Sequence, residues 1–221
     1  LCKALFARGD EVVVIDRCLY GRWGLIDGAK HLDMDMRDVG PEHVEGAHAL
    51  VNLGGLSNDP TSDLSPEVTY GLNTFATEHL AEVAVWGHVP RYVFASSAAV
   101  YDRMLSPSDA PATEETHTAP QAVYAASKLD AETRLLPFVA RGLCVTVLRK
   151  GTLHGVSPRM RYDLALNTFV RDGVSRHGLL LHAGGEMWRP VLDVEDAPAA
   201  EDLGEHLEAP RPDQPLDQVV L

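Results

Sequence analysis

The sequence predicts an α/β protein built on a doubly wound parallel sheet. Short apolar runs rich in β-branched residues recur along the chain, and longer helical patterns separate the later runs. Parallel strands need such helix-length crossovers, whereas antiparallel strands can be joined by tight turns. Residues 1–152 are expected to form this sheet domain, and residues 153–221 part of a smaller domain.

Each expected element rests on a local pattern. The chain opens in an amphipathic helical pattern, which places on one face Leu1, Ala4, Leu5 and Phe6. Five apolar runs of strand length follow, at residues 11–16, 31–35, 49–54, 91–96 and 144–149. The two main helical patterns span residues 66–86 and 121–140. Beyond these, segments such as "GVSPRM" and "AGGEMWRP" predict loops.

Composition excludes several classes of protein. The chain has 221 residues, of which 45% are hydrophobic, so it can bury a substantial core. Its formal charge of −13 repels nucleic acid and anionic lipid, and no apolar run approaches the ~20 residues of a membrane span. The three cysteines show no CxxC spacing, and the histidines do not show the paired spacing of metal ligands. We therefore expect a cytoplasmic protein with no metal site, no nucleic-acid partner and no membrane partner.

Polar residues and glycines stand at the ends of the expected strands, where such a sheet binds its ligands. Asp16 ends the first run, the position at which a Rossmann-type domain binds the adenosine ribose; the alternative is a strand-ending Asp that begins a turn. A carboxylate there disfavours a 2′-phosphate, so NAD is expected rather than NADP, although Arg17 acts in the opposite direction. Gly54 and Gly55 end another run and would let a pyrophosphate approach the backbone, or simply form a tight turn.

Tyr124 and Lys128 lie four residues apart in a helical pattern and therefore share a face. The Lys128 ammonium would stabilise a Tyr124 phenolate and reach ribose hydroxyls. A phenolate near a nicotinamide can take a proton from a sugar alcohol as hydride leaves its carbon. Ser96 and Ser97, at the end of a neighbouring run, would place hydroxyls in the same crevice.

The ordered set of motifs resembles the extended short-chain dehydrogenase/reductase family. The set comprises "VVVID", "LVNLGGLSNDP", "YVFASSAAVYD", "VYAASK", "VLRKGTLHG" and "WRPVLDVEDA". Within the family it is similar to the NAD-dependent nucleotide-sugar epimerases and dehydratases. The resemblance implies a Rossmann-type NAD-binding domain over residues 1–152 and part of a substrate-binding region over 153–221. It also implies a nucleotide-diphosphate sugar as substrate, and a homodimer is the assembly that we consider.

The resemblance further implies roles for individual residues. The catalytic residues would be Ser97, Tyr124 and Lys128, with Ser97 binding the reacting sugar oxygen. Besides Tyr124 and Lys128, the cofactor would be bound by Asp16 at the ribose, Asp35 and Met36 at the adenine, and Leu53, Gly54, Gly55 and Asn73. The nucleotide diphosphate would be held by Asn167 and Arg189.

The chain also departs from the family pattern. The glycine-rich phosphate loop and the first, central strand have no counterpart, the chain begins without Met inside a helical pattern, and it stops in the apolar run "LDQVVL". We expect an internal piece of a longer protein; the alternative is a degenerate relative. Asp193 stands where the family has histidine, and Gly54 fills a position that is often alanine.

The favoured activity is epimerisation by transient oxidation of a ring hydroxyl. A 4,6-dehydratase would need a further acid and base, but Ala98 and Ala99 follow Ser97 where the family's dehydratases have Asp and Glu. Glu114 or Glu115 could supply such a group from a loop. The remaining alternatives are a ketoreductase and a truncated, non-catalytic dinucleotide-binding relative.

Overall fold

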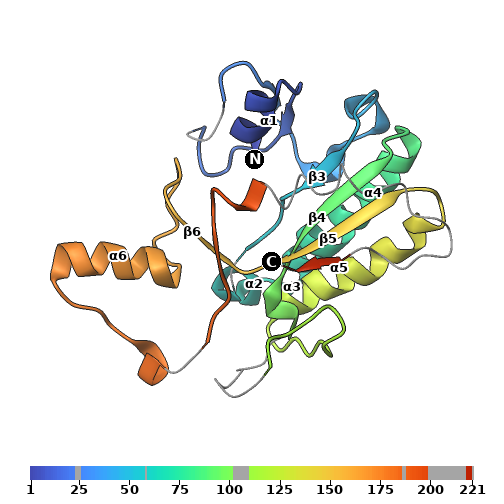
Figure 1. Ribbon diagram of the computed structural model, residues 1–221. Helices are drawn as coiled ribbons and strands as arrows, with labels where there is room; N and C mark the ends of the chain where they lie inside the picture. The colour runs from blue at the N-terminus through green and yellow to red at the C-terminus, as the bar shows by residue number, and fades with distance from the viewer. Residues whose placement is uncertain (23–25, 58, 102–109, 186–187, 199–217, 221) are drawn as a thin grey trace.

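A computed structural model gives the fold, and it describes residues 1–22, 26–57, 59–101, 110–185, 188–198 and 218–220. At its centre, four parallel strands lie in the order β3–β4–β5–β8 (Figure 1). Their bounds are Leu50–Asn52 for β3, Arg91–Ser97 for β4, Cys144–Lys150 for β5 and Gln218–Val220 for β8. A second parallel pair joins β1 (Val13–Ile15) to β2 (Lys30–Leu32). All five predicted strands are present: β1 and β3 are shorter at both ends, β2 begins one residue earlier and ends three earlier, and β4 and β5 each extend one residue further.

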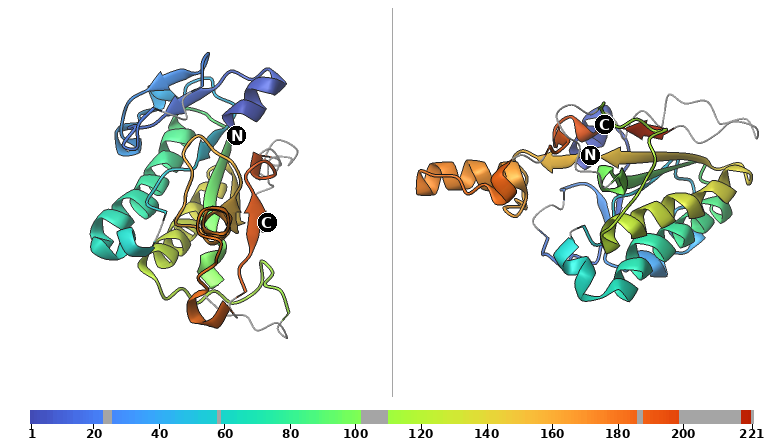
Figure 2. Two further views of the ribbon diagram at one scale, coloured as in Figure 1. Left: turned by 90° about the vertical axis from the view of Figure 1, so that its left-hand side faces the viewer. Right: turned by 90° about the horizontal axis from the view of Figure 1, so that it is seen from below.

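The helices match the two main helical patterns of the sequence. The bounds are Cys2–Arg8 for α1, Asp59–Leu64 for α2, Pro66–Tyr70 for α3, Ala76–Trp86 for α4, Val123–Val139 for α5 and Ala165–Arg176 for α6. A π-helical segment, Gly71–Phe75, joins α3 to α4, so helical structure is continuous from 66 to 86. Helices α4 and α5 lie side by side on one face of the central sheet (Figure 2).

The region after residue 152 contains more regular structure than its sequence indicated. Strand β6 (Thr152–His154) pairs in parallel with β7 (Val191–Asp193), and α6 lies between them in the chain. Two three-residue strands are too short to show a period of two, and each forms only because the other is brought beside it. Short 3₁₀ turns complete the fold at Met36–Asp38, Pro41–His43, Ala98–Tyr101 and His182–Gly185.

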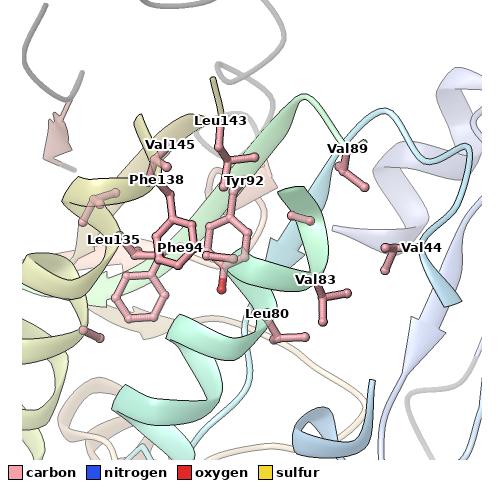
Figure 3. Close-up of a cluster of buried hydrophobic side chains, with 14 of the residues drawn as sticks. Val44, Leu80, Val83, Val89, Tyr92, Phe94, Leu135, Phe138, Leu143 and Val145 are labelled. Atoms are coloured by element: carbon pink, nitrogen blue, oxygen red, sulfur yellow. The ribbon is translucent and has the colours of Figure 1, made fainter. Parts of the chain in front are cut away.

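The main core lies between the sheet and the two helices that cover it (Figure 3). Strand β4 contributes Tyr92 and Phe94, and α5 contributes Leu135 and Phe138, all less than 5% exposed. Each fully buried side chain of this size contributes roughly 1.5–3 kcal/mol through removal of apolar surface from water. This packing fixes α5 against β4, and α5 carries the Tyr–Lys pair.

A polar network inside the core supports the loop after β3. The Asn52 side-chain amide donates to Thr77 Oγ1 and to Tyr92 Oη, at 3.0 Å each. Its Oδ1 accepts the backbone N–H of Gly54 at 3.0 Å. Burial raises the pKa of Tyr92, so its hydroxyl stays protonated and donates to the Thr77 carbonyl at 3.1 Å. The turn that begins at Gly54 is therefore tied to the interior.

No disulfide joins Cys2, Cys18 and Cys144. In the part of the chain that the structure describes, no helix combines the length and the apolar character that a membrane crossing requires.

Candidate active site at the carboxyl edge of the sheet

Several predicted site residues follow the carboxyl ends of parallel strands, in the β1–β2 pair and in the central sheet. Asp16 follows β1, Asp35 follows β2, Leu53–Gly55 follow β3, and Ser97 ends β4. Ser97 lies opposite Lys150 in the register of β4 and β5. Tyr124 and Lys128 come from the first turns of α5, which packs against β4.

Lys128 is fixed at this edge by burial and by one backbone contact. Its side chain is 4% exposed, its Nζ donates to the Ala95 carbonyl at 2.8 Å, and it lies 4.6 Å from the centre of the Phe94 ring. Burial lowers the pKa of Lys128 to about 7; the nearby Lys150 charge acts in the same direction, and Glu132 acts against it. The amine therefore changes charge near neutral pH.

Tyr124 lies one helical turn before Lys128 and is partly buried. Ala122, in an extended conformation, precedes the helix, and the Ser127 hydroxyl donates to the Tyr124 carbonyl at 2.7 Å. Ser97 is also partly buried, and its Oγ accepts the backbone N–H of Ala99 at 3.2 Å. The structure thus leaves Tyr124 and Ser97 accessible in part while it buries Lys128.

The side chain of Asn73 connects the loop after β3, which contains Gly54 and Gly55, to helix α5. It has no exposed surface; its Oδ1 accepts the Leu56 N–H at 2.8 Å, and its Nδ2 donates to the Leu56 carbonyl and to Ser127 Oγ, at 3.0 Å each. Because these hydrogen bonds occupy the side chain, Asn73 stabilises this loop from the interior of the protein and does not face solvent. Gly55 allows this contact, since a Cβ there would lie 2.3 Å from Asn73 Oδ1 and its φ is +124°.

A buried ion pair, which the sequence analysis missed, lies behind the site. Arg149 donates to the Glu132 carboxylate at 2.7–3.2 Å and to Tyr101 Oη at 2.8 Å. Ser96 Oγ donates to the same carboxylate. An arginine in the apolar run "CVTVLR" and a glutamate four residues after Lys128 were the available signals. The network joins β5, α5 and the turn after β4.

The two acidic residues predicted at the adenosine end lie in different settings. Asp16 is exposed, its Oδ1 accepts the backbone N–H of Cys18 at 2.7 Å, and it lines a cavity of about 90 Å³. Asp35 is buried, and its carboxylate is bonded to two guanidiniums, those of Arg17 and Arg37. Met36 packs against the core near Gly54, and Leu53 is 49% exposed.

The two residues predicted at the substrate end differ in exposure. Asn167 is buried, and its Nδ2 donates to the Arg161 carbonyl at 3.1 Å, so it fastens the loop before α6. Arg189 is exposed, just before β7. Arg161, which the sequence analysis did not single out, donates to Ser57 Oγ at 2.9 Å. Tyr124 is near enough to contribute to the raised pKa of the Arg161 guanidinium.

The described residues contain no cluster of three or more His, Cys, Asp or Glu side chains that could hold a metal ion.

Comparison with known proteins identifies a family and several similar structures. The model of the family "NAD dependent epimerase/dehydratase family" matches residues 1–203. Among solved structures, the chain is similar to MoeE5 in complex with UDP-glucuronic acid and NAD, with 25% identity, a TM-score of 0.80, and coverage of 100% of this chain and 70% of that one.

Two further solved structures are similar to this chain. One is the UDP-glucose 4-epimerase of Thermus thermophilus in complex with NAD, at 25% identity and a TM-score of 0.79, covering 94% of this chain and 70% of that one. The other is DesIV, a dTDP-glucose 4,6-dehydratase from Streptomyces venezuelae with NAD and TYD bound, at 25% identity and a TM-score of 0.78, covering 91% of this chain and 66% of that one. By the family model and the shared Rossmann-type fold, this chain belongs to the NAD dependent epimerase/dehydratase family of enzymes.

Proposed function

We propose that the protein uses NAD to epimerise a nucleotide-activated sugar, through transient oxidation of one ring hydroxyl to a ketone. The observation that supports this most directly is the placement of Ser97, Tyr124 and Lys128 at the carboxyl edge of one sheet. Similar solved proteins include an epimerase and a protein bound to UDP-glucuronic acid, each with NAD. The three cysteines form no disulfide, so we expect the enzyme to work in the reducing cytoplasm.

The residues present fit a dinucleotide. The exposed Asp16 carboxylate borders a cavity of about 90 Å³ and can accept hydrogen bonds from ribose hydroxyls. Gly54 and Gly55 are exposed just after β3 and would let the pyrophosphate approach the backbone. The Lys128 amine would be the donor to the ribose of the nicotinamide. In this site a bound NAD would supply the acceptor and the donor of hydride.

The proton is handled by the chain's own side chains. Tyr124 Oη, as phenolate, takes the proton from the sugar hydroxyl while the C–H electrons leave as hydride. Ser97 Oγ binds the same sugar oxygen, and the Lys128 ammonium stabilises the phenolate. In the return step the phenol gives the proton back to the oxygen. Arg189, exposed before β7, would bind the diphosphate, and Asn167 would hold the loop that carries Arg161.

The second candidate is a 4,6-dehydratase, which the similarity to DesIV favours. Loss of water needs a base for the proton beside the ketone and an acid for the leaving hydroxyl. Ala98 and Ala99 follow Ser97 in the 3₁₀ turn and offer neither group, while Glu114 and Glu115 are exposed. The lack of an acid and base directly after Ser97 favours epimerisation.

Product analysis in heavy water separates the two. Offered UDP- and dTDP-hexoses with NAD, the enzyme is expected to invert one ring carbon with no deuterium entering the sugar. A 4-keto-6-deoxy product, or deuterium beside the ketone, would assign it as a dehydratase or as an epimerase working through an enolate.

Tyr124→Phe tests the catalytic assignment. It should lower turnover by about 10² to 10⁴, the usual share of general acid–base catalysis, with little change in NAD affinity. Tyr70→Phe, which removes a hydroxyl from α3, is the matched control and should keep parental turnover. Equal turnover in Tyr124→Phe and the parent would show that another group moves the proton.

A further inference from the structure

Two arginines converge on one carboxylate at the adenosine end of the site. Arg17 follows β1, Asp35 follows β2, and these strands pair in parallel, so the two residues leave neighbouring strands at the same edge. Arg17 Nη1 donates to Asp35 Oδ2 at 2.8 Å. Arg37 donates through Nε to Oδ1 at 2.9 Å and through Nη2 to Oδ2 at 2.7 Å, a bidentate pair.

The carboxylate is buried, whereas its partners are not. The Asp35 side chain is 9% exposed, against 48% for Arg17 and 51% for Arg37. The Arg37 hydrogen bonds hold the pKa of Asp35 well below its usual range, so the carboxylate stays charged through the physiological range of pH. Both guanidiniums remain within reach of a ligand in solvent.

Arg17 stands next to the residue expected to bind the ribose. In this type of domain an acid at the strand end accepts the ribose 2′-hydroxyl of NAD, while a nearby arginine accommodates the 2′-phosphate of NADP. Asp16 and Arg17 thus place the acid typical of NAD sites next to the arginine typical of NADP sites. Of the two, Arg17 is paired with a further side chain, that of Asp35. Asp16, Arg17, Asp35 and Arg37 together carry no net charge, so nothing in this group favours a phosphate dianion.

We propose that Asp35 sets the dinucleotide preference by holding Arg17 away from the ribose 2′ position. With the carboxylate in place, Arg17 is paired and the 2′-hydroxyl of NAD is preferred. Without it, Arg17 becomes a ligand for a 2′-phosphate and NADP binding rises. This inference rests on the proposed function, because it takes the adenosine end of the dinucleotide to lie beside Asp16.

The test is Asp35→Asn, which keeps the shape of the side chain and an oxygen for the Arg37 backbone N–H that now donates at 2.9 Å. Dissociation constants for NAD, NADP and adenosine 2′,5′-bisphosphate are measured by calorimetry on parent and variant. We expect the ratio of NADP affinity to NAD affinity to rise about 10- to 100-fold in the variant, the size of one charge-assisted hydrogen bond, and the bisphosphate to bind more tightly by a similar factor.

Asp172→Asn is the matched control, because it removes the same charge from a buried carboxylate on α6 that pairs with two arginines, Arg171 and Arg176. It should leave the ratio of NADP to NAD affinity unchanged. Arg17→Ala, added to Asp35→Asn, should abolish the gain. Asp35→Glu retains a carboxylate and should keep the parental preference, which separates loss of charge from a disturbed turn.

The outcomes are distinct. An unchanged ratio in Asp35→Asn, an equal gain in Asp172→Asn, or a gain that survives Arg17→Ala would each overturn the inference. In each of these cases, NAD binding by the parent would leave the proposed function intact. A parent that binds no NAD would overturn the proposed function, and this inference with it.

Discussion

Replacing Arg149 with methionine should strongly destabilise the protein. Arg149 and Glu132 are only 6% and 5% exposed in their side chains, and they lie 2.7 Å apart at their closest atoms. After the replacement, the buried Glu132 carboxylate keeps the Ser96 hydroxyl as a partner but loses its counter-charge. Breaking one side of a buried ion pair costs about 3–5 kcal/mol, which is roughly a fifth or more of the ~5–15 kcal/mol that holds a typical domain folded.

The assay is urea unfolding followed by circular dichroism, with the slope of the transition compared between variants. Arg134→Met is the control: Arg134 pairs on the same helix with Asp130 and across to Glu78, but its side chain is 35% exposed, so its loss should cost less than about 1 kcal/mol.

A double variant tests the physical reason. Glu132→Leu with Arg149→Met removes both charges, so it should lose less stability than the two single changes added together. A loss below about 1 kcal/mol for Arg149→Met, or strict additivity in the double variant, would refute the reasoning that the pair is desolvated and mutually dependent.

Two further predictions concern Gly55 and Lys128. Gly55→Ala should lower turnover and should lower stability by about 1–3 kcal/mol, because its φ is +124° and the new Cβ would clash with Asn73 Oδ1. Gly142→Ala is the control in the same urea assay: Gly142 has a φ of +89°, but its new Cβ would have no atom within 4 Å, so this variant measures the backbone strain alone. Equal losses in the two glycine variants would contradict the clash with Asn73. Because the folded-state pKa of Lys128 is lowered from 10.5 to about 7, the unfolded chain binds the extra proton between these values, and the contribution of Lys128 to stability should increase as pH rises through this window. Unfolding measured at pH 7 and about pH 9.5 should show a rise on the order of 1 kcal/mol per pH unit that Lys128→Met removes, and an identical pH slope in that variant would show that Lys128 is well solvated.

The class of fold and the shared helix face of Tyr124 and Lys128 could both be predicted from the sequence alone. Runs such as "RYVFAS" and "CVTVLR" carry their strand signal locally, in β-branched and apolar side chains, and the helical period over residues 121–140 appears as α5. The spacing of Tyr124 and Lys128 fixes their shared face in any helix. The family motifs could be identified without coordinates for the same reason, because each is a short, contiguous string.

Tertiary structure decided what the charged side chains do. Arg17 lies 18 residues from Asp35, and Arg149 lies 17 from Glu132, so no local period relates the partners. Likewise, the pairing of β6 with β7 joins segments on either side of α6, and the lowered pKa of Lys128 depends on burial against β4. Burial and long-range pairing are properties of the packed chain, since they depend on which segments meet and how much water they exclude.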